Sequence, residues 1–227
     1  MQKDMFLKEE GNKWFNRNYN ELKTIDPLND MVLKAIDFVS ISPPQTHTTT
    51  SNRLLEIGCS DGSRLKLIKD KYLFDCYGID PSVDAIEEGG GKYGLNLKVG
   101  TADNLQFEDK YFNIILFGFS LYLCDRDDLF KIAYETDRIL SDNGYLIIND
   151  FQPPFPYKNI YKHCKEISSY KLDYASMFKW NPVYTELFNF IFTHNGHSKR
   201  EIPDERIGIK ILYKNERYAY PHMIQWD

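Results

Sequence analysis

The sequence lacks the features that would place it outside a reduced, aqueous compartment. Its 227 residues include four cysteines, which form neither a C-x-x-C pair nor a metal-ligand spacing, so we expect free thiols and no metal site. No stretch approaches the roughly 20 apolar residues of a membrane-spanning helix, and the first residues contain no apolar core of a secretory signal. A cytoplasmic protein without a membrane partner is therefore expected.

Positive charge is also scarce. Lysine and arginine number 28 against 33 aspartates and glutamates, which gives a formal net charge of −5. Because phosphate binding needs a basic face, this balance disfavours a nucleic-acid partner and leaves a small-molecule substrate as the expectation. Hydrophobic residues make up 42% of the chain, enough for the core of one large domain. The oligomeric state stays open.

From residue 53 onward, short apolar runs alternate with helical patterns. The patterns predict strands at 53–57, 75–79, 95–99, 112–117 and 144–149, and helices at 63–71, 82–88 and 126–140. Such alternation is typical of a parallel sheet covered by helices on both faces. Two later strand-like segments, 186–193 and 206–214, predict an antiparallel hairpin that completes the sheet. The expected class is therefore a three-layer, Rossmann-like α/β fold.

The segments that flank this core differ from it in composition. Apolar residues recur at helical spacing before residue 40, namely Leu28, Met31, Val32, Ala35, Ile36 and Val39. A breaker-rich stretch at 42–52 predicts a loop, and residues 151–185 are rich in aromatics and proline. We expect one domain, 1–227, made of a helical segment (1–45), a core (53–150), an insertion (151–185) and a hairpin (186–214).

The first core strand leads into a loop of small residues, LLEIGCSDGS at 54–63. Gly58 and Gly62 let the backbone turn sharply and approach a ligand, and the helix beyond offers free N–H groups. A dinucleotide-binding loop would read G-x-G-x-x-G, but Ser63 stands where the third glycine would be. Glu56, just before the loop, suits an ammonium group better than a pyrophosphate.

Two further acidic anchors follow at the ends of the next two strands. Asp80 lies in YGIDPS, where a carboxylate can accept ribose hydroxyls. It follows the glycine loop at about the distance of 20 residues that is expected for a ribose-binding acid. Asp103 lies in GTADNL, where an acidic side chain can accept the adenine amino group. Ligands of open α/β sheets bind outside the carboxyl ends of the strands, so the three anchors should share one crevice.

In type and order these motifs resemble those of the class I S-adenosylmethionine (SAM)-dependent methyltransferases, over roughly residues 54–151. The resemblance implies a seven-stranded, mostly parallel sheet with a C-terminal antiparallel hairpin, SAM as cofactor and S-adenosyl-L-homocysteine (SAH) as product. It also implies cofactor contacts, with the methionine end on Glu56, Gly58, Ser60 and Gly62, the ribose on Asp80 beside Pro81, the adenine on Ala102, Asp103 and Asn104, and the sulfonium next to Phe119. Many relatives carry a histidine after the fourth strand, and here Ser120 to Asp125 contain none.

The acceptor is expected at the insertion, which begins where the fifth strand reaches the crevice. This stretch resembles, less securely, methyltransferases of bacterial surface-glycan and modified-sugar biosynthesis, which implies a sugar or nucleotide-sugar hydroxyl or amine. His163 is the candidate general base, and Asp150 can orient it or the acceptor. The candidate acceptor contacts are tyrosines, Tyr122, Tyr157, Tyr161 and Tyr174. The N-terminal helices are expected to form a lid, in which Arg17 can pair with the methionine carboxylate.

Four other interpretations stay open at this point. The chain can be a SAM-binding protein without transferase activity, or a methyltransferase of another small metabolite. A nicotinamide-dependent oxidoreductase is disfavoured by the loop spacing. A nucleic-acid methyltransferase would carry an Asn/Asp-Pro-Pro-Tyr-like motif at the end of the fourth strand. The two similar segments, QPPF at 152–155 and NPVY at 181–184, both follow the fifth strand instead.

Overall fold

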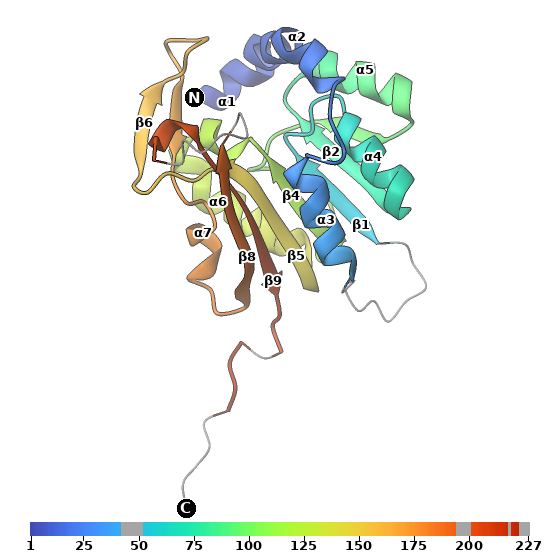
Figure 1. The fold of residues 1–227 in the computed structure, drawn as a ribbon, viewed down its shortest axis with the longest axis vertical. Coiled ribbons are helices and arrows are strands. Elements are labelled where there is room, and N and C mark those ends of the chain that lie inside the picture. Colours follow the sequence, from blue (N-terminus) through green and yellow to red (C-terminus); the bar gives the residue numbers. More distant parts are fainter. Residues whose placement is uncertain (42–51, 194–200, 218, 223–227) are drawn as a thin grey trace, which may run out of the picture.

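A seven-stranded sheet forms the centre of the computed structural model, which describes residues 1–41, 52–193, 201–217 and 219–222. Its strand order is β3-β2-β1-β4-β5-β9-β8. Strands β1 (Arg53–Ile57), β2 (Asp75–Asp80), β3 (Asn96–Val99), β4 (Phe112–Gly118) and β5 (Leu140–Phe151) run parallel. Strand β9 (Arg206–Lys214) runs antiparallel to both β5 and β8 (Tyr184–Thr193). The predicted fold class and the C-terminal hairpin are therefore confirmed (Figure 1).

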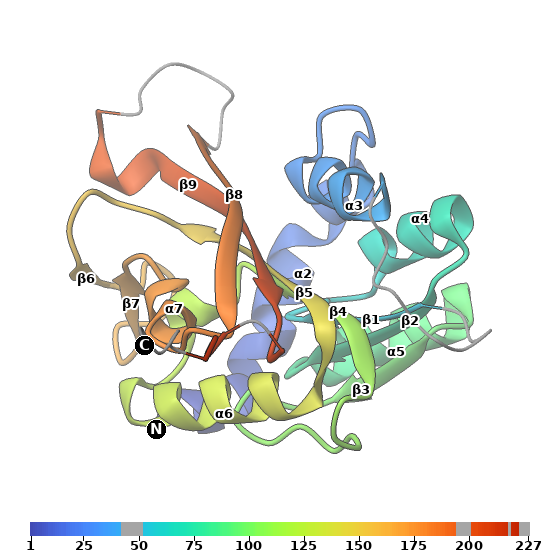
Figure 2. The same ribbon diagram turned by 90° about the horizontal axis from the view of Figure 1, so that it is seen from below.

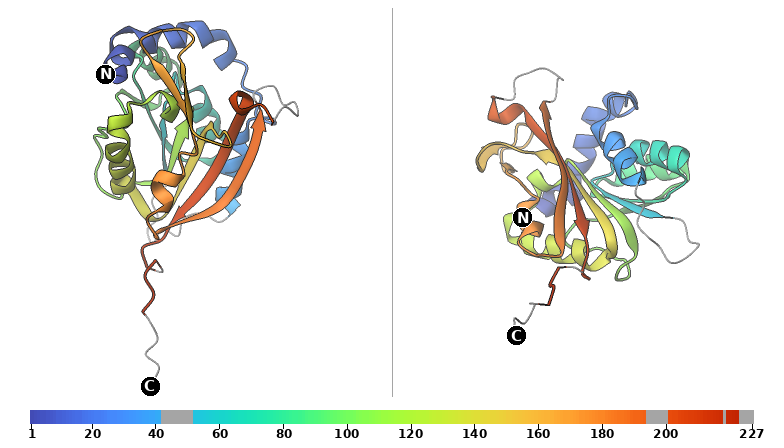
Figure 3. Two further views of the ribbon diagram at one scale, coloured as in Figure 1. Left: turned by 90° about the vertical axis from the view of Figure 1, so that its left-hand side faces the viewer. Right: turned by 60° about the horizontal axis from the view of Figure 1, so that its bottom comes forward.

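Helices cover both faces of this sheet. One apolar cluster joins the sheet to α3 (Met31–Ile41) and α4 (Ser63–Tyr72), and α5 (Val83–Tyr93) adds the partly buried Ile86. A second cluster joins the other face to α6 (Leu129–Ile139) and α7 (Ser176–Lys179). Figures 2 and 3 show the resulting three layers, with α6 and α3 on opposite sides of the sheet. The central strands are buried on both faces, as their continuous apolar runs predicted.

The boundaries differ from the predicted ones in several places. Leu28 is 82% exposed, and α3 begins only at Met31. The helix predicted from residue 126 begins with a 3₁₀ turn, η3 (Arg126–Asp128), before α6. Strand β5 is twelve residues long and starts at Leu140, because an irregularity in its pairing with β4 lets it begin earlier than the apolar run at 144–149 indicates. Most of the predicted loop at 42–52, and residues 194–200 of the predicted polar loop, lie outside the described residues.

Two additions to the sheet lie at its carboxyl edge. The N-terminal segment consists of α1 (Gln2–Met5), a π-helical turn η1 (Phe6–Glu10) and α2 (Gly11–Leu22), and it crosses the top of the sheet in Figure 1. The insertion after β5 contains a separate two-stranded sheet, β6 (Tyr157–Ile160) and β7 (Ser168–Lys171). A small apolar cluster joins the two additions, with Met5, Phe6 and Trp14 packed against Leu123, Tyr161 and Ile167. The other short elements are the 3₁₀ turns η2 (Leu121–Leu123) and η4 (Pro203–Glu205).

Candidate active site

A crevice of about 850 Å³, partly open to solvent, lies between the carboxyl ends of the strands and the N-terminal segment. Its floor comes from the loops that follow β1, β2, β3 and β4, and its cover comes from α1, η1 and α2. Six of the predicted cofactor contacts line it, namely Gly58, Asp80, Pro81, Ala102, Asp103 and Phe119. Lining residues that the sequence motifs did not indicate include Lys3, Phe6, Asp125 and Asp128. The rule that ligands bind outside the carboxyl ends of the strands therefore predicted most of the floor of the crevice. It does not indicate which residues cover the crevice.

Gly58 brings the backbone of the β1–α4 loop close to the end of β4. Its φ of 80° lies in the left-handed region, and a Cβ placed there would come within 2.8 Å of the Cβ of Ser120. The amide N–H of Gly58 donates to the carbonyl of Ile79 at 2.8 Å, which fixes the loop to the end of β2. Only glycine combines this conformation with this approach. The loop therefore offers bare backbone to a ligand.

Asp80 ties the same loop to the start of α5. Its two carboxylate oxygens accept hydrogen bonds from the backbone N–H groups of Ser60 and Ser82, both at 2.9 Å. Burial of the carboxyl group raises its pKa to about 6, against the lowering effect of these two bonds. The oxygens keep unused lone pairs toward the crevice. Asp80 is thus a hydrogen-bond acceptor whose ionised form is destabilised by burial.

Glu56 lies beneath the loop with half of its hydrogen-bonding capacity unused. Its Oε1 accepts from Nη1 of Arg64 at 2.6 Å, whereas its buried Oε2 has no partner. The buried Oγ of Ser60 is also without one. Burial raises the pKa of Glu56, and the opposing charge of Arg64 lowers it. Buried polar atoms are rarely left unsatisfied, so these two atoms indicate a missing polar ligand beside Gly58.

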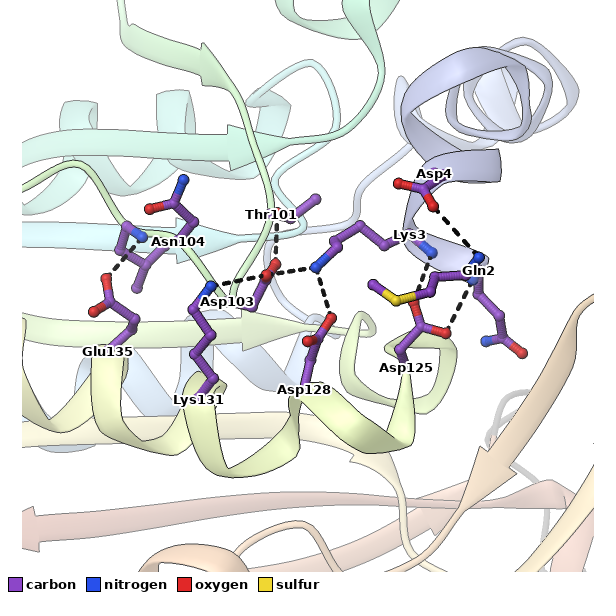
Figure 4. A network of polar contacts seen from close by, with 12 residues as sticks. Gln2, Lys3, Asp4, Thr101, Asp103, Asn104, Asp125, Asp128, Lys131 and Glu135 are labelled. Atoms are coloured by element: carbon purple, nitrogen blue, oxygen red, sulfur yellow. Dashed lines mark hydrogen bonds and ion pairs between the residues drawn. The ribbon is translucent and has the colours of Figure 1, made fainter.

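The far end of the crevice is closed by ion pairs from the N-terminal segment (Figure 4). The Nζ of Lys3 lies 2.6 Å from Oδ2 of Asp103 and 2.7 Å from Oδ2 of Asp128. Asp125 accepts from the backbone N–H groups of Gln2 and Lys3, both at 2.9 Å, and so satisfies the free end of α1. Three carboxylates of the core therefore hold α1 in place.

Helix α2 continues the cover toward the ribose anchor. At Gly11 a Cβ would come within 3.1 Å of the backbone nitrogen of Ser82, so the absence of a side chain allows α2 to touch the β2–α5 loop. Oδ1 of Asn12 accepts from the hydroxyl of Ser82 at 2.9 Å and from the N–H of Asp84 at 3.2 Å. The N-terminal segment therefore contacts both ends of the crevice.

Five predicted cofactor contacts lie outside the crevice lining. Glu56 and Ser60 are buried, and Gly62 occupies the N-cap of α4 with φ of 74°. Asn104 is exposed, and its contact with the adenine stays a prediction. Arg17 donates to Oε1 of Glu10 at 2.6 Å and to the hydroxyl of Tyr161 at 3.2 Å. Its pairing with a methionine carboxylate stays a prediction.

The residues predicted for the acceptor side are spread over several environments. Tyr122 packs edge to face against Phe119 and Phe151, with ring centroids 6.3 and 5.0 Å apart. Tyr161 is buried between the N-terminal segment and the insertion, and Tyr157 donates to Asp204. Tyr174 is 2% exposed, and its hydroxyl is already bonded to Arg126 and to the carbonyl of Tyr170. We therefore leave Tyr174 out of the proposed acceptor contacts.

The two predicted catalytic residues, Asp150 and His163, contact different parts of the chain. Asp150 is buried at the end of β5 and accepts from the backbone N–H groups of Leu121, Tyr122 and Phe151. Burial raises its pKa to about 7 in spite of these bonds. His163 is exposed in the β6–β7 loop, with its ring 5.4 Å from that of Tyr161. Asp150 therefore fixes the turn after β4, and the role of His163 stays a prediction.

The crevice and sheet order define the class I SAM-dependent methyltransferase fold. A SAM-dependent methyltransferase from Methanosarcina mazei has a TM-score of 0.57 at 17% identity, with 74% of this chain and 95% of that chain covered. An S-adenosylmethionine-dependent methyltransferase from Mesorhizobium loti has a TM-score of 0.59 at 10% identity, with 83% and 100% covered. At these identities the likeness establishes the fold.

Residues 55–148 match the family model described as a methyltransferase domain. A fatty-acid O-methyltransferase from Mycolicibacterium smegmatis (strain ATCC 700084 / mc(2)155) is 28% identical over 160 residues, which cover 66% of this chain and 56% of that protein. The chain thus spans little more than half the length of this relative. Within the described residues, every helix is too short or too polar to cross a membrane.

The residues of the crevice fit S-adenosyl-L-methionine, the cofactor that the sequence motifs predict. The bare backbone at Gly58, the unpartnered Oε2 of Glu56 and the carboxylate of Asp80 match an amino-acid end followed by a ribose. Ile79, Ala102 and Ile132 provide apolar walls beyond Asp80. These residues would hold and orient the cofactor and exclude water from it, and its sulfonium would supply an electrophilic methyl group.

Proposed function

We propose that this chain transfers a methyl group from SAM to a small polar acceptor. The observation that carries the proposal is the crevice itself, in which the glycine loop, Asp80 and the residues after β3 converge at the carboxyl ends of adjacent strands. Methyl transfer is an in-line displacement, so holding the acceptor atom opposite the leaving sulfur supplies much of the catalysis. The alternative of a SAM-binding protein without transferase activity requires that no acceptor reaches the crevice.

We infer that the acceptor enters beside Phe119 and Ser120. Phe119 lines the crevice and is held at φ of 56°, an uncommon conformation for a side chain of this size. Its ring contacts Tyr122 and Phe151, so the end of β4 presents an aromatic wall. Strained residues that the fold holds in place often lie at functional sites. This wall, extended by the polar insertion, supports the sugar or nucleotide-sugar acceptor that the sequence suggested.

A carboxylic acid is the second candidate acceptor. A carboxylate is already nucleophilic at neutral pH and needs no general base, whereas a sugar hydroxyl benefits from one. His163 is exposed, and Asp150 is engaged by backbone N–H groups. The relative from Mycolicibacterium smegmatis is a fatty-acid O-methyltransferase. One cation lies at the aromatic wall, since Nζ of Lys171 lies 3.8 Å from the ring centroid of Phe151, and it also pairs with Asp204 at 2.7 Å.

Release of SAH in the presence of candidate acceptors tests the proposal. If a sugar hydroxyl is methylated with His163 as base, His163→Ala lowers kcat by roughly 10²- to 10⁴-fold and leaves SAM affinity unchanged. His222→Ala, in the exposed C-terminal tail, is the matched control and retains full activity. Full activity of His163→Ala would exclude this histidine from the mechanism. Turnover with fatty acids and not with sugars would identify a carboxylate, rather than a sugar hydroxyl, as the acceptor group. An absence of turnover across sugars, amines and carboxylic acids supports the binding-protein alternative.

We also infer that the N-terminal segment is a lid. It contributes Lys3, Phe6, Gly11 and Trp14 to the crevice and packs on the insertion rather than into the sheet. Deletion of residues 1–18 should therefore weaken SAM binding while the remaining chain still unfolds cooperatively. Calorimetry of the truncated chain checks both parts. Loss of the cooperative transition would show that the segment belongs to the core.

A further inference from the structure

A guanidinium group with unused donors lies where the N-terminal lid meets the insertion. Nη2 of Arg17, in α2, donates to Oε1 of Glu10 at 2.6 Å and to the hydroxyl of Tyr161 at 3.2 Å. Nε and Nη1 of Arg17 have no partner in the part of the chain that the structure describes. Because 31% of this side chain is exposed, these N–H groups are accessible to a ligand.

Two tyrosine hydroxyls accompany this guanidinium. The hydroxyl of Tyr161 accepts from Arg17, so its own hydrogen stays available. Tyr122 packs beside Tyr161 in the apolar cluster between the lid and the insertion, and its hydroxyl has no hydrogen bond to any described residue. Burial raises the pKa of both hydroxyls, against the lowering effect of the Arg17 charge. Both tyrosines therefore keep a hydrogen to donate at neutral pH.

These donors lie one aromatic ring beyond the crevice. Tyr122 packs edge to face on Phe119, with ring centroids 6.3 Å apart, and Phe119 lines the crevice. The ring of Phe6, which also lines it, lies 6.4 Å from that of Tyr161. Arg17 and the two tyrosines are not part of the lining. An acceptor that enters beside Phe119 therefore extends toward them, whereas a cofactor held within the crevice does not reach them.

The segment that carries Tyr161 is positively charged in an otherwise acidic chain. Residues 157–171 include four lysines and one histidine, with Glu166 as their single acidic residue. Three of these lysines are exposed, namely Lys158, Lys162 and Lys165. Arg17 is balanced by the buried Glu10, so the lysines supply the net charge. A field of this sign attracts an acidic ligand toward the cluster.

We propose that Arg17, Tyr122 and Tyr161 bind an oxyanion of the acceptor, a carboxylate or a phosphate group, and so select an acidic acceptor over a neutral one. The inference rests on the proposed methyl transfer and specifies the charge of its acceptor. The groups left free on Arg17 are all donors, each tyrosine has a hydrogen to give, and an oxyanion only accepts. The proposal moves Arg17 from the methionine carboxylate of the cofactor to the acceptor.

Titration calorimetry of the chain saturated with SAH tests the proposal with two pairs of probes. Octanoate is compared with octanamide, and glucose 1-phosphate is compared with glucose. Each pair changes the charge and keeps the rest of the molecule, and the two pairs distinguish a carboxylate from a phosphate. The charged member of one pair should bind roughly 10- to 100-fold more tightly than its neutral counterpart, as expected for hydrogen bonds to a charged group.

Two variants assign this preference to the cluster. Tyr161→Phe removes one hydroxyl and keeps the ring that packs between the lid and the insertion, so it should fold and bind the charged probe about tenfold less tightly. Arg17→Lys keeps a positive charge beside Glu10 but loses the planar fork, and should also reduce the preference. The matched controls are Tyr134→Phe and Lys8→Gln, both at exposed positions, and they should retain it.

The affinity for SAH is the second measurement, and it should be unchanged in both cluster variants. If Arg17→Lys weakens SAH and keeps the preference for the charged probe, Arg17 belongs to the methionine carboxylate and the inference is overturned. Equal binding of the charged and neutral probes in both pairs would also overturn it, and would leave methyl transfer standing. A wild-type chain that binds no SAH would refute the proposed function itself.

Discussion

Gly58→Val should abolish measurable SAM binding. A Cβ at this position would lie 2.8 Å from the Cβ of Ser120 and 3.2 Å from the carbonyl oxygen of Gly118, and a β-branched residue is strongly disfavoured at φ of 80°. The loop must therefore move away from the end of β4 or fill the space of the ligand. We expect a loss on the order of 100-fold or more in affinity for SAH, measured by titration calorimetry.

Gly90→Ala is the matched control for this substitution. Gly90 lies in α5, and a Cβ there would meet no atom within 4 Å. Alanine is favoured over glycine in a helix by about 1 kcal/mol, so this variant should bind SAH normally and be slightly more stable. Binding of SAH to Gly58→Val as tightly as to Gly90→Ala would refute the proposed role of the loop.

Asp80→Ala should weaken SAH binding by roughly 10- to 100-fold, because a charge-assisted contact to the ribose is lost. The same carboxylate holds the amides of Ser60 and Ser82, so some of this loss comes from a looser loop. 5′-Methylthioadenosine, which retains the ribose but lacks the amino-acid end, should be weakened as well. An Asp80→Ala variant with parental affinity for both ligands would show that the ribose lies elsewhere.

The raised pKa of Asp80 also predicts a pH dependence of cofactor affinity. Burial lifts this pKa to about 6, so the free protein loses the negative charge as the pH falls through 6. The protonated carboxyl group is a poorer acceptor for ribose hydroxyls. Affinity for SAH should therefore be constant above this pH and fall by up to about tenfold per pH unit below it. Asp80→Ala should lack this dependence, which assigns the titration to the residue.

The floor of the crevice was predictable because it follows from local sequence. The turn at Gly58 and the acid at Asp80 each lie at the end of a strand, and parallel strands in one sheet must bring these ends to the same edge. Alternating apolar runs predicted the strands, and the order of the motifs predicted the fold that the structure confirms. Local sequence patterns are therefore sufficient to predict the strands and the residues at their carboxyl ends.

The cover of the crevice was not predictable in the same way. Lys3 meets Asp103 across a hundred residues of chain, and no periodic pattern marks either residue as a partner of the other. The lid was expected from its aromatic and basic residues, but Arg17 pairs within the lid with Glu10, and Lys3 reaches the adenine end instead. Contacts of this kind depend on how a terminal segment packs, and tertiary packing is invisible to spacing arguments.

Titration of the wild-type chain with SAM and with NAD⁺ tests the central claim most directly. The wild-type chain should bind one equivalent of SAM in the crevice and give no heat with NAD⁺. Its unfolding temperature should rise steadily as the logarithm of the SAM concentration increases. Binding of NAD⁺ instead of SAM, or a folded protein that binds neither SAM nor SAH, would contradict the account of the crevice.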